Sequence, residues 1–243
     1  YITYLTQSGL SLPDRDYYLV DEPQYVKLRQ QLSQYAADLL TAVGFEDAEA
    51  MGAAIVEIES AIAKQQWTKT ENRDPIKTYN SRTPEELDAM MGPFPWASFR
   101  DAYGLDKAQS MVVRQPTYFD ALGKLIGEFS IDQWNAYLAF HAVDAYASGL
   151  SEELEKRHFD FHGTAISGID EQRPLWKRAV GTTGSVLGEL VGQLYVEKHF
   201  TPRAKERMNE LVDNLKQAFA GRIETLEWMG EGTKKQALEK LTQ

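Results

Sequence analysis

The stretch PQYVKLRQQLSQYAADLLTAVG, from Pro23 to Gly44, decides the fold class of this chain. Its apolar residues recur every three or four positions, as they do on one face of an α-helix, and they are Tyr25, Leu28, Leu32, Tyr35, Leu39 and Val43. A proline is tolerated in the first helical turn, and a glycine commonly follows the last one. The segment therefore predicts an amphipathic helix that begins near Pro23 and stops at Gly44.

Helical periodicity continues along most of the remaining chain. The next apolar stripe consists of Met51, Ile55, Ile58 and Ile62. Serine or threonine caps predict four further helix starts, at Thr83–Glu86, Ser130–Gln133, Thr201–Pro202 and Thr233–Gln236. The helix that follows Pro202 has the clearest apolar face, formed by Met208, Leu211, Leu215, Phe219, Ile223 and Leu226.

Strand signals are sparse. The best is SMVVR, from Ser110 to Arg114, a short run that Gln115 and Pro116 end. We expect it to form at most one edge strand or an extended connector. The sequence therefore predicts a mainly α fold, a multi-helix lobe with at most one or two short strands.

Composition excludes several classes of function. The 243 residues carry a net charge of −10, which opposes binding to a phosphate backbone, so we expect no nucleic-acid partner. No apolar run approaches the length of a spanning helix, and we expect no membrane contact by this segment. The absence of cysteine excludes disulfides and cysteine-ligated metal. Because the chain opens on Tyr1 and closes on an uncapped helical pattern, we expect it to be a piece of a longer protein.

Two histidines, His158 and His162, are spaced as a helical zinc-binding pair would be. In the zinc peptidase signature a glutamate directly follows the first histidine and acts as general base, whereas Phe159 stands there. The spacing reveals no third ligand. We therefore expect no metal site at this pair, and the alternative of a genuine site predicts zinc retention that His162→Ala abolishes.

The remaining candidates have structural explanations. Glu57 and Glu59 lie two apart and do not face each other on a helix, so we expect a solvated face. We expect Gly181, Gly184 and Gly188 to permit close helix packing. No catalytic constellation emerges from the residues themselves.

Several short blocks of the sequence are distinctive, and they are Gly9–Leu19, Trp67–Asp74, Lys77–Asn80, Pro174–Arg178, Gly192–Glu197, Leu226–Met229 and Thr233–Lys235. In this order they resemble the neprilysin and endothelin-converting-enzyme-like family of zinc metallopeptidases. Their family-signature residues, to which we assign structural roles, are Pro13, Asp14, Arg15, Asp16, Tyr17, Trp67, Arg73, Asp74, Tyr79, Asn80, Trp176, Lys177, Arg178, Tyr195, Trp228 and Met229. Because it has no cysteine, the chain resembles the bacterial oligopeptidase branch of this family.

The resemblance implies part of a zinc-dependent metalloendopeptidase, a hydrolase that cuts short peptides inside a chamber between two lobes. Residues 1–243 would form the single helical lobe that restricts access to this chamber. Within it, residues 1–66 would form a corner and a helical pair, 67–95 an irregular connector, and 96–243 the main helical body leading toward the catalytic lobe.

The same resemblance places the zinc ligands and the catalytic residues after Gln243. This chain alone would then bind no zinc and be inactive. Its partners would be the catalytic lobe and peptide substrates, and the protein would be periplasmic or secreted. The alternative is a non-enzymatic helical interaction module.

Overall fold

The computed structural model describes residues 2–242, so Tyr1 and Gln243 lie outside the description. The α-helices are α1 (Asp16–Leu19), α2 (Pro23–Ala42), α3 (Ala48–Gln65), α4 (Pro84–Met91), α5 (Trp96–Ala102), α6 (Pro116–Leu125), α7 (Ile131–Ala147), α8 (Glu152–His158), α9 (Leu175–Val186), α10 (Gly188–His199), α11 (Pro202–Thr225) and α12 (Glu231–Leu241). A 3₁₀ helix, η1 (Glu71–Arg73), and a π-helix, η2 (Phe159–Ile166), complete the helical part. The strands are β1 (Thr3–Leu5), β2 (Ser81–Arg82) and β3 (Met111–Val113). The prediction of a mainly α fold is confirmed.

The chain divides into two compact units, one ending at Gln172 and the other beginning at Arg173. No described helix combines the length and the apolar character that crossing a bilayer would demand. That both units belong to one lobe of a larger protein stays a prediction.

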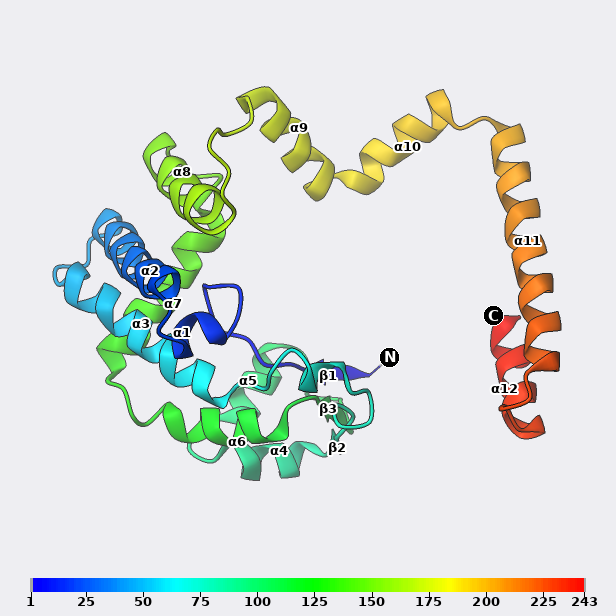
Figure 1. Ribbon diagram of the computed structural model, residues 1–243, viewed down its shortest axis with the longest axis horizontal. Helices are drawn as coiled ribbons and strands as arrows, with labels where there is room; N and C mark the ends of the chain where they lie inside the picture. Colours follow the sequence, from blue (N-terminus) through cyan, green and yellow to red (C-terminus); the bar gives the residue numbers. More distant parts are fainter. Residues whose placement is uncertain (1, 243) are drawn as a thin grey trace. The chain divides into compact units, whose positions relative to one another are not determined.

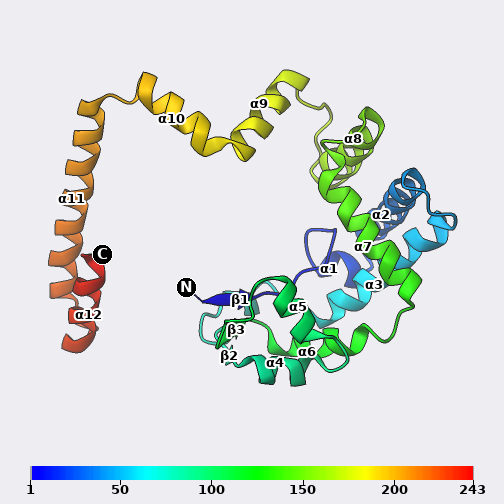
Figure 2. The same ribbon diagram turned by 180° about the vertical axis from the view of Figure 1, so that it is seen from behind.

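The core of the first unit lies between α2, α3 and α7, which run beside one another in Figures 1 and 2. Most of the predicted apolar faces of α2 and α3 is buried there, and Phe140 of α7 packs against them. Val43, which lies beyond the end of α2, is 46% exposed. A Cβ atom at Gly52 would lie 2.4 Å from the Ser33 carbonyl oxygen, so glycine lets α3 approach α2 this closely. Gly44, at φ 90°, follows α2 as predicted.

A three-stranded sheet packs at the end of the unit near α4 and α6 (Figure 1). The SMVVR run forms β3, which is the central strand and not an edge: it pairs in parallel with β1 and antiparallel with β2. All three β3 residues are fully buried. The prediction of an edge strand or connector was wrong because the two neighbouring strands could not be recognised. β1 and β2 have only three and two residues, which is too short for an alternating pattern to appear.

The second unit contains α9 to α12, with α12 folded back along α11 (Figure 1). The apolar face predicted for α11 exists, but its residues from Met208 to Phe219 are between 48% and 63% exposed, and among the unit's described residues only Ile223 is buried. Helix α12 begins at Glu231 after Gly230, two residues before the predicted Thr233 cap. The unit therefore has helices with apolar faces and almost no core.

The three glycines assigned to close packing do not serve that role within this unit. A Cβ atom at Gly181, Gly184 or Gly188 would meet no described atom within 4 Å. The prediction that these three glycines permit close helix packing is therefore wrong for the described residues. Close approaches occur instead at Gly52 and at Gly123 of α6.

Candidate functional site

The corner that begins at Gly9 is fixed to a buried carboxylate, Glu59 of α3. Glu59 is fully buried and accepts hydrogen bonds from the Ser11 amide at 2.9 Å, the Ser11 hydroxyl at 2.7 Å and the Tyr18 hydroxyl. His141 of α7 lies 3.1 Å from Oε1, the oxygen that also accepts from the Ser11 hydroxyl. These polar partners compensate for the lost hydration of the carboxylate.

The expectation of a solvated face for Glu59 is therefore wrong, although it holds for the exposed Glu57. The corner covers Glu59 from one side and α7 from the other. A signal was available in the sequence, since Glu59 interrupts the apolar stripe of Ile55, Ile58 and Ile62 at a helical position that faces the core.

Asp14 and Arg15 connect the corner to the end of α3. Asp14 accepts from the Asp16 amide at 2.8 Å and lies 3.0 Å from the Lys69 ammonium. Arg15 donates to the Gln66 carbonyl oxygen. These contacts join the turn to the end of α3, and the structural role assigned to its charged residues stays a prediction.

Aromatic rings hold the two sides of the same corner. Gly9 has φ 93°, and its carbonyl accepts from the Tyr137 hydroxyl at 3.0 Å. Tyr17 packs against Tyr25 of α2 with ring centroids 4.5 Å apart, while Pro13 is exposed. The corner is thus anchored to α2, α3 and α7.

The second signature block joins the corner through Trp67. Gln7 and Trp67 exchange two hydrogen bonds, of 3.0 and 2.8 Å, and the Trp67 indole donates to Thr117 at 2.7 Å. The Lys77 ammonium lies 4.8 Å from the centre of the Trp67 ring, within cation–π range. Trp67 therefore links the segment after β1, the connector and α6.

Residues 71–80 form a loop that is held by hydrogen bonds between its own residues. Asp74 accepts from the amides of Ile76 and Lys77 at 2.9 and 3.0 Å. The Lys77 ammonium, together with hydrogen bonds from Thr68, lowers the pKa of Glu71 to about 2.

The loop joins the sheet at Asn80, whose backbone carbonyl accepts from the Val113 amide at 2.8 Å. The Asn80 amide donates to the Val113 carbonyl at the end of β3 at 3.1 Å. Arg73 and Tyr79 are exposed.

The signature residues of the second unit are mostly exposed. Trp176, Tyr195 and Trp228 have exposed fractions of 65%, 62% and 77%. The Lys177 ammonium lies 5.4 Å from the Trp176 ring centre, Arg178 donates to the Arg173 carbonyl at 2.9 Å, and Met229 is half-buried. The structure brings Pro13, Asp14 and Arg15 close to Trp67 and leaves the signature residues of the second unit without a core.

His158 and His162 lie on one side of the continuous helix made by α8 and η2, with ring centroids 4.5 Å apart. Asp144 of α7 approaches them, and its carboxylate lies 2.9 Å from a ring nitrogen of His162. One potential ligand atom from each of the three residues lies within 4.8 Å of the other two. The sequence reading missed Asp144, because its separation from the histidines follows no local period.

Electrostatics in this cluster depend on Tyr35 of α2, whose hydroxyl donates to Asp144 at 2.6 Å. Partial burial alone would raise the pKa of Asp144, but the hydrogen bonds from His162 and Tyr35 outweigh it and the pKa is lowered. Partial burial, reinforced by the neighbouring His162, lowers the pKa of His158.

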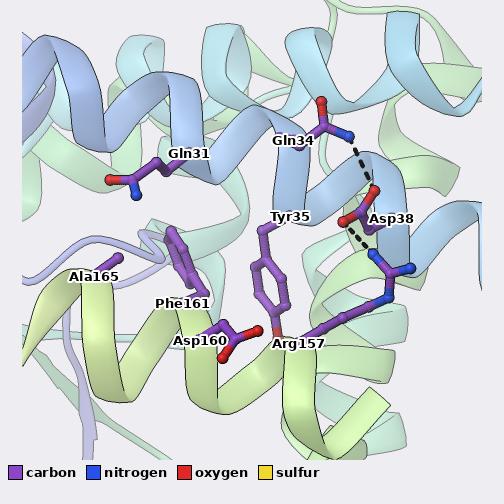
Figure 3. A pocket seen from close by; sticks show the side chains of 8 residues that line it. All are labelled: Gln31, Gln34, Tyr35, Asp38, Arg157, Asp160, Phe161 and Ala165. Carbon is purple, nitrogen blue, oxygen red and sulfur yellow. Dashed lines mark hydrogen bonds and ion pairs between the residues drawn. The ribbon is translucent and has the colours of Figure 1, made fainter. Parts of the chain in front are cut away.

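A surface pocket of about 230 Å³ lies beside this cluster, and Figure 3 shows its lining. Tyr35 and Phe161 form one part of its wall with their rings stacked 4.6 Å apart. Arg157 binds Asp38, which also accepts from Gln34 at 2.9 Å, so the opposing charges neutralise each other (Figure 3).

A second hollow, of about 540 Å³, is mainly apolar. Its lining includes Ile62, Phe94, Leu122, Trp134 and Tyr137. Neither hollow places a serine, threonine or lysine beside a histidine or carboxylate base among its lining residues, so the arrangement in each is suited to packing and binding more than to covalent catalysis.

Comparison with known proteins identifies relatives over the whole chain. The profile described as peptidase family M13 matches residues 1–243. Neprilysin-2 of Drosophila melanogaster is 32% identical over 203 residues, which cover 76% of this chain and 26% of the relative. Human endothelin-converting enzyme 1 is 27% identical over 246 residues, covering 98% of this chain and 32% of the relative. The chain spans about a third or less of the length of these relatives.

Solved structures share the fold. The Mycobacterium tuberculosis zinc metalloprotease Zmp1, in complex with an inhibitor, superposes with a TM-score of 0.82 at 32% identity, over 100% of this chain and 37% of that one. PepO from Lactobacillus rhamnosis superposes with a TM-score of 0.77 at 21% identity, over 98% of this chain and 38% of that one. The second likeness concerns the fold alone.

Proposed function

Because the chain belongs to peptidase family M13, we propose that it is part of a zinc-dependent metalloendopeptidase that hydrolyses short peptides. In this proposal the chain forms the helical lobe that restricts access to the chamber where hydrolysis occurs. The observation that carries the proposal is the superposition of the entire chain on 37% of a zinc metalloprotease at 32% identity.

The described residues do not fit the catalytic zinc site of such an enzyme. Each of the four histidines is followed by a residue other than glutamate, and Phe159 occupies that place after His158. The donor set of Asp144, His158 and His162 therefore lacks the adjacent general base that the resemblance implies. We assign the catalytic zinc and its ligands to the rest of the protein, and no catalytic residue to this chain.

The exposed apolar faces of the second unit support packing against another part of the same protein. Leu211, Leu215 and Phe219 of α11 are 49%, 58% and 63% exposed, and apolar faces of this kind are stable when another surface covers them. Because the relatives extend over about three times the length of this chain, we propose the catalytic lobe as the cover.

The first unit supports a rigid wall. Hydrogen bonds of Ser11 and Gly9, together with the Tyr17–Tyr25 ring contact, fix the corner to α3, α7 and α2, which suits a surface that must keep its shape while peptides pass it. Peptide substrates would be selected by size, since folded proteins do not enter a closed chamber.

Peptide hydrolysis by two proteins tests the proposal: the 243-residue chain and the product of the reading frame extended beyond Gln243. We expect the longer protein to cut a short quenched-fluorescent peptide, to lose activity to a chelator and regain it with Zn²⁺, and to spare a folded protein. The shorter chain should cut neither. Chelator-sensitive cleavage by the shorter chain would overturn the division of roles.

An inactive longer protein with no metal dependence would favour the helical interaction module instead. We further propose a periplasmic or secreted location, on the basis of the family resemblance. Cell fractionation with an antibody against this chain checks it, and recovery in the cytoplasm alone contradicts it.

A further inference from the structure

The cluster of Asp144, His158 and His162 has a geometry that its hydrogen bonds leave partly unexplained. Asp144 Oδ1 accepts from Tyr35 and lies within hydrogen-bond distance of His162. In the described part of the chain, no residue bonds the second carboxylate oxygen of Asp144, and the His158 ring has no hydrogen-bond partner. The cluster thus holds an imidazole and a carboxylate oxygen with free lone pairs.

The backbone places both imidazoles on the same side. Helix α8 continues without a break into η2, an eight-residue π-helix, and the two histidines are four residues apart across that junction. π-Helical segments are rare and recur at functional sites. Here the wider turn brings the rings within 4.5 Å of each other, facing Asp144 on α7.

We propose that Asp144, His158 and His162 bind a divalent transition-metal ion, with Zn²⁺ as the best match. Two imidazole nitrogens and one carboxylate oxygen are a common zinc ligand set, with water completing a tetrahedron. This site is separate from the catalytic zinc and does not rest on the proposed peptidase activity.

The distances require only small side-chain adjustments. Zinc bound at about 2.0–2.2 Å keeps tetrahedral ligand atoms about 3.3–3.5 Å apart. The Asp144 oxygen and the His162 nitrogen are now 2.9 Å apart, which is shorter than a bound ion requires. The ligand atoms of all three residues lie within 4.8 Å of one another, so the widest separation has to shrink by only a small amount. An ion would replace the direct Asp144–His162 hydrogen bond.

Neighbouring side chains already hold the ligands in place. The Tyr35 hydroxyl bonds Asp144 at 2.6 Å, and the Tyr35 and Phe161 rings meet the His162 ring edge-on with centroids 5.7 and 5.0 Å away. Outer contacts of this kind orient metal ligands and raise affinity. The Asp144 and His162 side chains are 18% and 29% exposed, which leaves an ion a route from solvent.

Zinc content measured on the intact protein that contains this chain tests the proposal. After chelator treatment and dialysis against Zn²⁺, wild-type protein should hold one more zinc ion per chain than His158→Gln. His158→Gln is the informative variant because it removes no hydrogen bond, so circular dichroism should show an unchanged fold. The matched control is His199→Gln, an exposed histidine of α10 that should not change the zinc content.

Two further readouts separate binding from a structural effect. Co²⁺ should give a visible ligand-field band in the wild type that is reduced in His158→Gln and in Asp144→Asn. Tyr35→Phe, which keeps all three ligands, should weaken Zn²⁺ binding in calorimetry by about 10- to 100-fold. Peptide hydrolysis should be retained in His158→Gln, which distinguishes this site from the catalytic zinc.

Equal zinc content and equal Co²⁺ spectra in wild type and His158→Gln would overturn the proposal and leave a hydrogen-bond cluster. A wild-type protein that holds a single zinc ion, lost with the peptidase activity, would overturn it as well. Loss of peptide hydrolysis in every protein, with the zinc difference intact, would contradict the proposed function only.

Discussion

Glu59 carries its carboxylate into the interior of the first unit, where polar groups of the corner and of α7 bond it. Ser11, Tyr18 and His141 come from three different segments and meet at this side chain. A buried carboxylate of this kind specifies the position of the corner more than it adds stability, but removing it leaves its partners buried without an acceptor.

We predict that Glu59→Ala lowers the free energy of unfolding by about 3–5 kcal/mol, the usual cost of breaking a buried charged network. Glu59→Gln should cost less, because the amide keeps one acceptor oxygen. Glu57→Ala, the exposed neighbour on the same helix, should change the value by no more than about 0.5 kcal/mol. Urea unfolding followed by circular dichroism measures all three, and equal losses for Glu57→Ala and Glu59→Ala would contradict the role of burial.

Helices could be predicted from this sequence where a period and a cap coincide. Capping boxes at Thr83 and Ser130 were expected, and both form with their glutamate or glutamine partner. Helix α11 begins at Pro202 as predicted. Start signals are local, so a short window of sequence contains them in full.

What could not be predicted depends on contacts between elements. The sheet joins residues more than a hundred positions apart, such as Thr3 and Met111. The Asp144 ligand belongs to α7 and the histidines to α8 and η2, and only the packing of these elements brings them together. The position of Glu59 on the core-facing side of α3 was readable from the stripe, but the corner groups that bond it, Ser11 and Tyr18, were not.

The close packing of α6 against the end of α4 depends on the absence of a side chain at Gly123. A Cβ atom there would lie 2.1 Å from the Met91 carbonyl oxygen, so α6 could not keep its present distance from the end of α4. We expect Gly123→Ala to lower the free energy of unfolding by about 1–3 kcal/mol, as overpacking does.

Gly181→Ala provides the matched comparison, because its Cβ position in α9 meets no described atom within 4 Å. Alanine has the higher helix propensity, so this change should stabilise the helix by about 0.5–1 kcal/mol. Thermal unfolding of the two variants of this chain should show a lower melting temperature for Gly123→Ala and a higher one for Gly181→Ala. Equal shifts in melting temperature for both glycines would show that backbone entropy, and not the α4–α6 contact, controls them.

The two units of the molecule differ in how they are stabilised. The first buries a continuous cluster that includes Leu32, Leu39, Ile55 and Phe140, whereas among the described residues of the second only Ile223 is buried. Buried tyrosines follow the same division, since Tyr18, Tyr35, Tyr118 and Tyr137 all belong to the first unit. Alkaline conditions should therefore act on the first unit through its core.

Burial raises the pKa of each of these four tyrosines, and the charge of Glu59 raises the pKa of Tyr18 and Tyr137 further. A tyrosine phenol in the unfolded chain ionises at about pH 10. Above that pH the folded state binds more protons than the unfolded state, because its buried phenols are still protonated. The stability that these groups contribute is complete below about pH 10 and declines as the pH rises, by up to about 1.4 kcal/mol per pH unit for each tyrosine.

We therefore predict that the first unit unfolds cooperatively in alkali and that tyrosinate absorbance from the buried rings appears together with the loss of helical circular dichroism. Tyr118→Phe removes one ionisable group together with one hydrogen bond, to the Ser8 carbonyl, so it should make the decline of stability with pH less steep. Urea unfolding at a series of pH values measures that slope. Full tyrosine ionisation with unchanged helix content would contradict the link between core burial and alkaline stability, because the buried phenols would then have lost their protons without the fold opening.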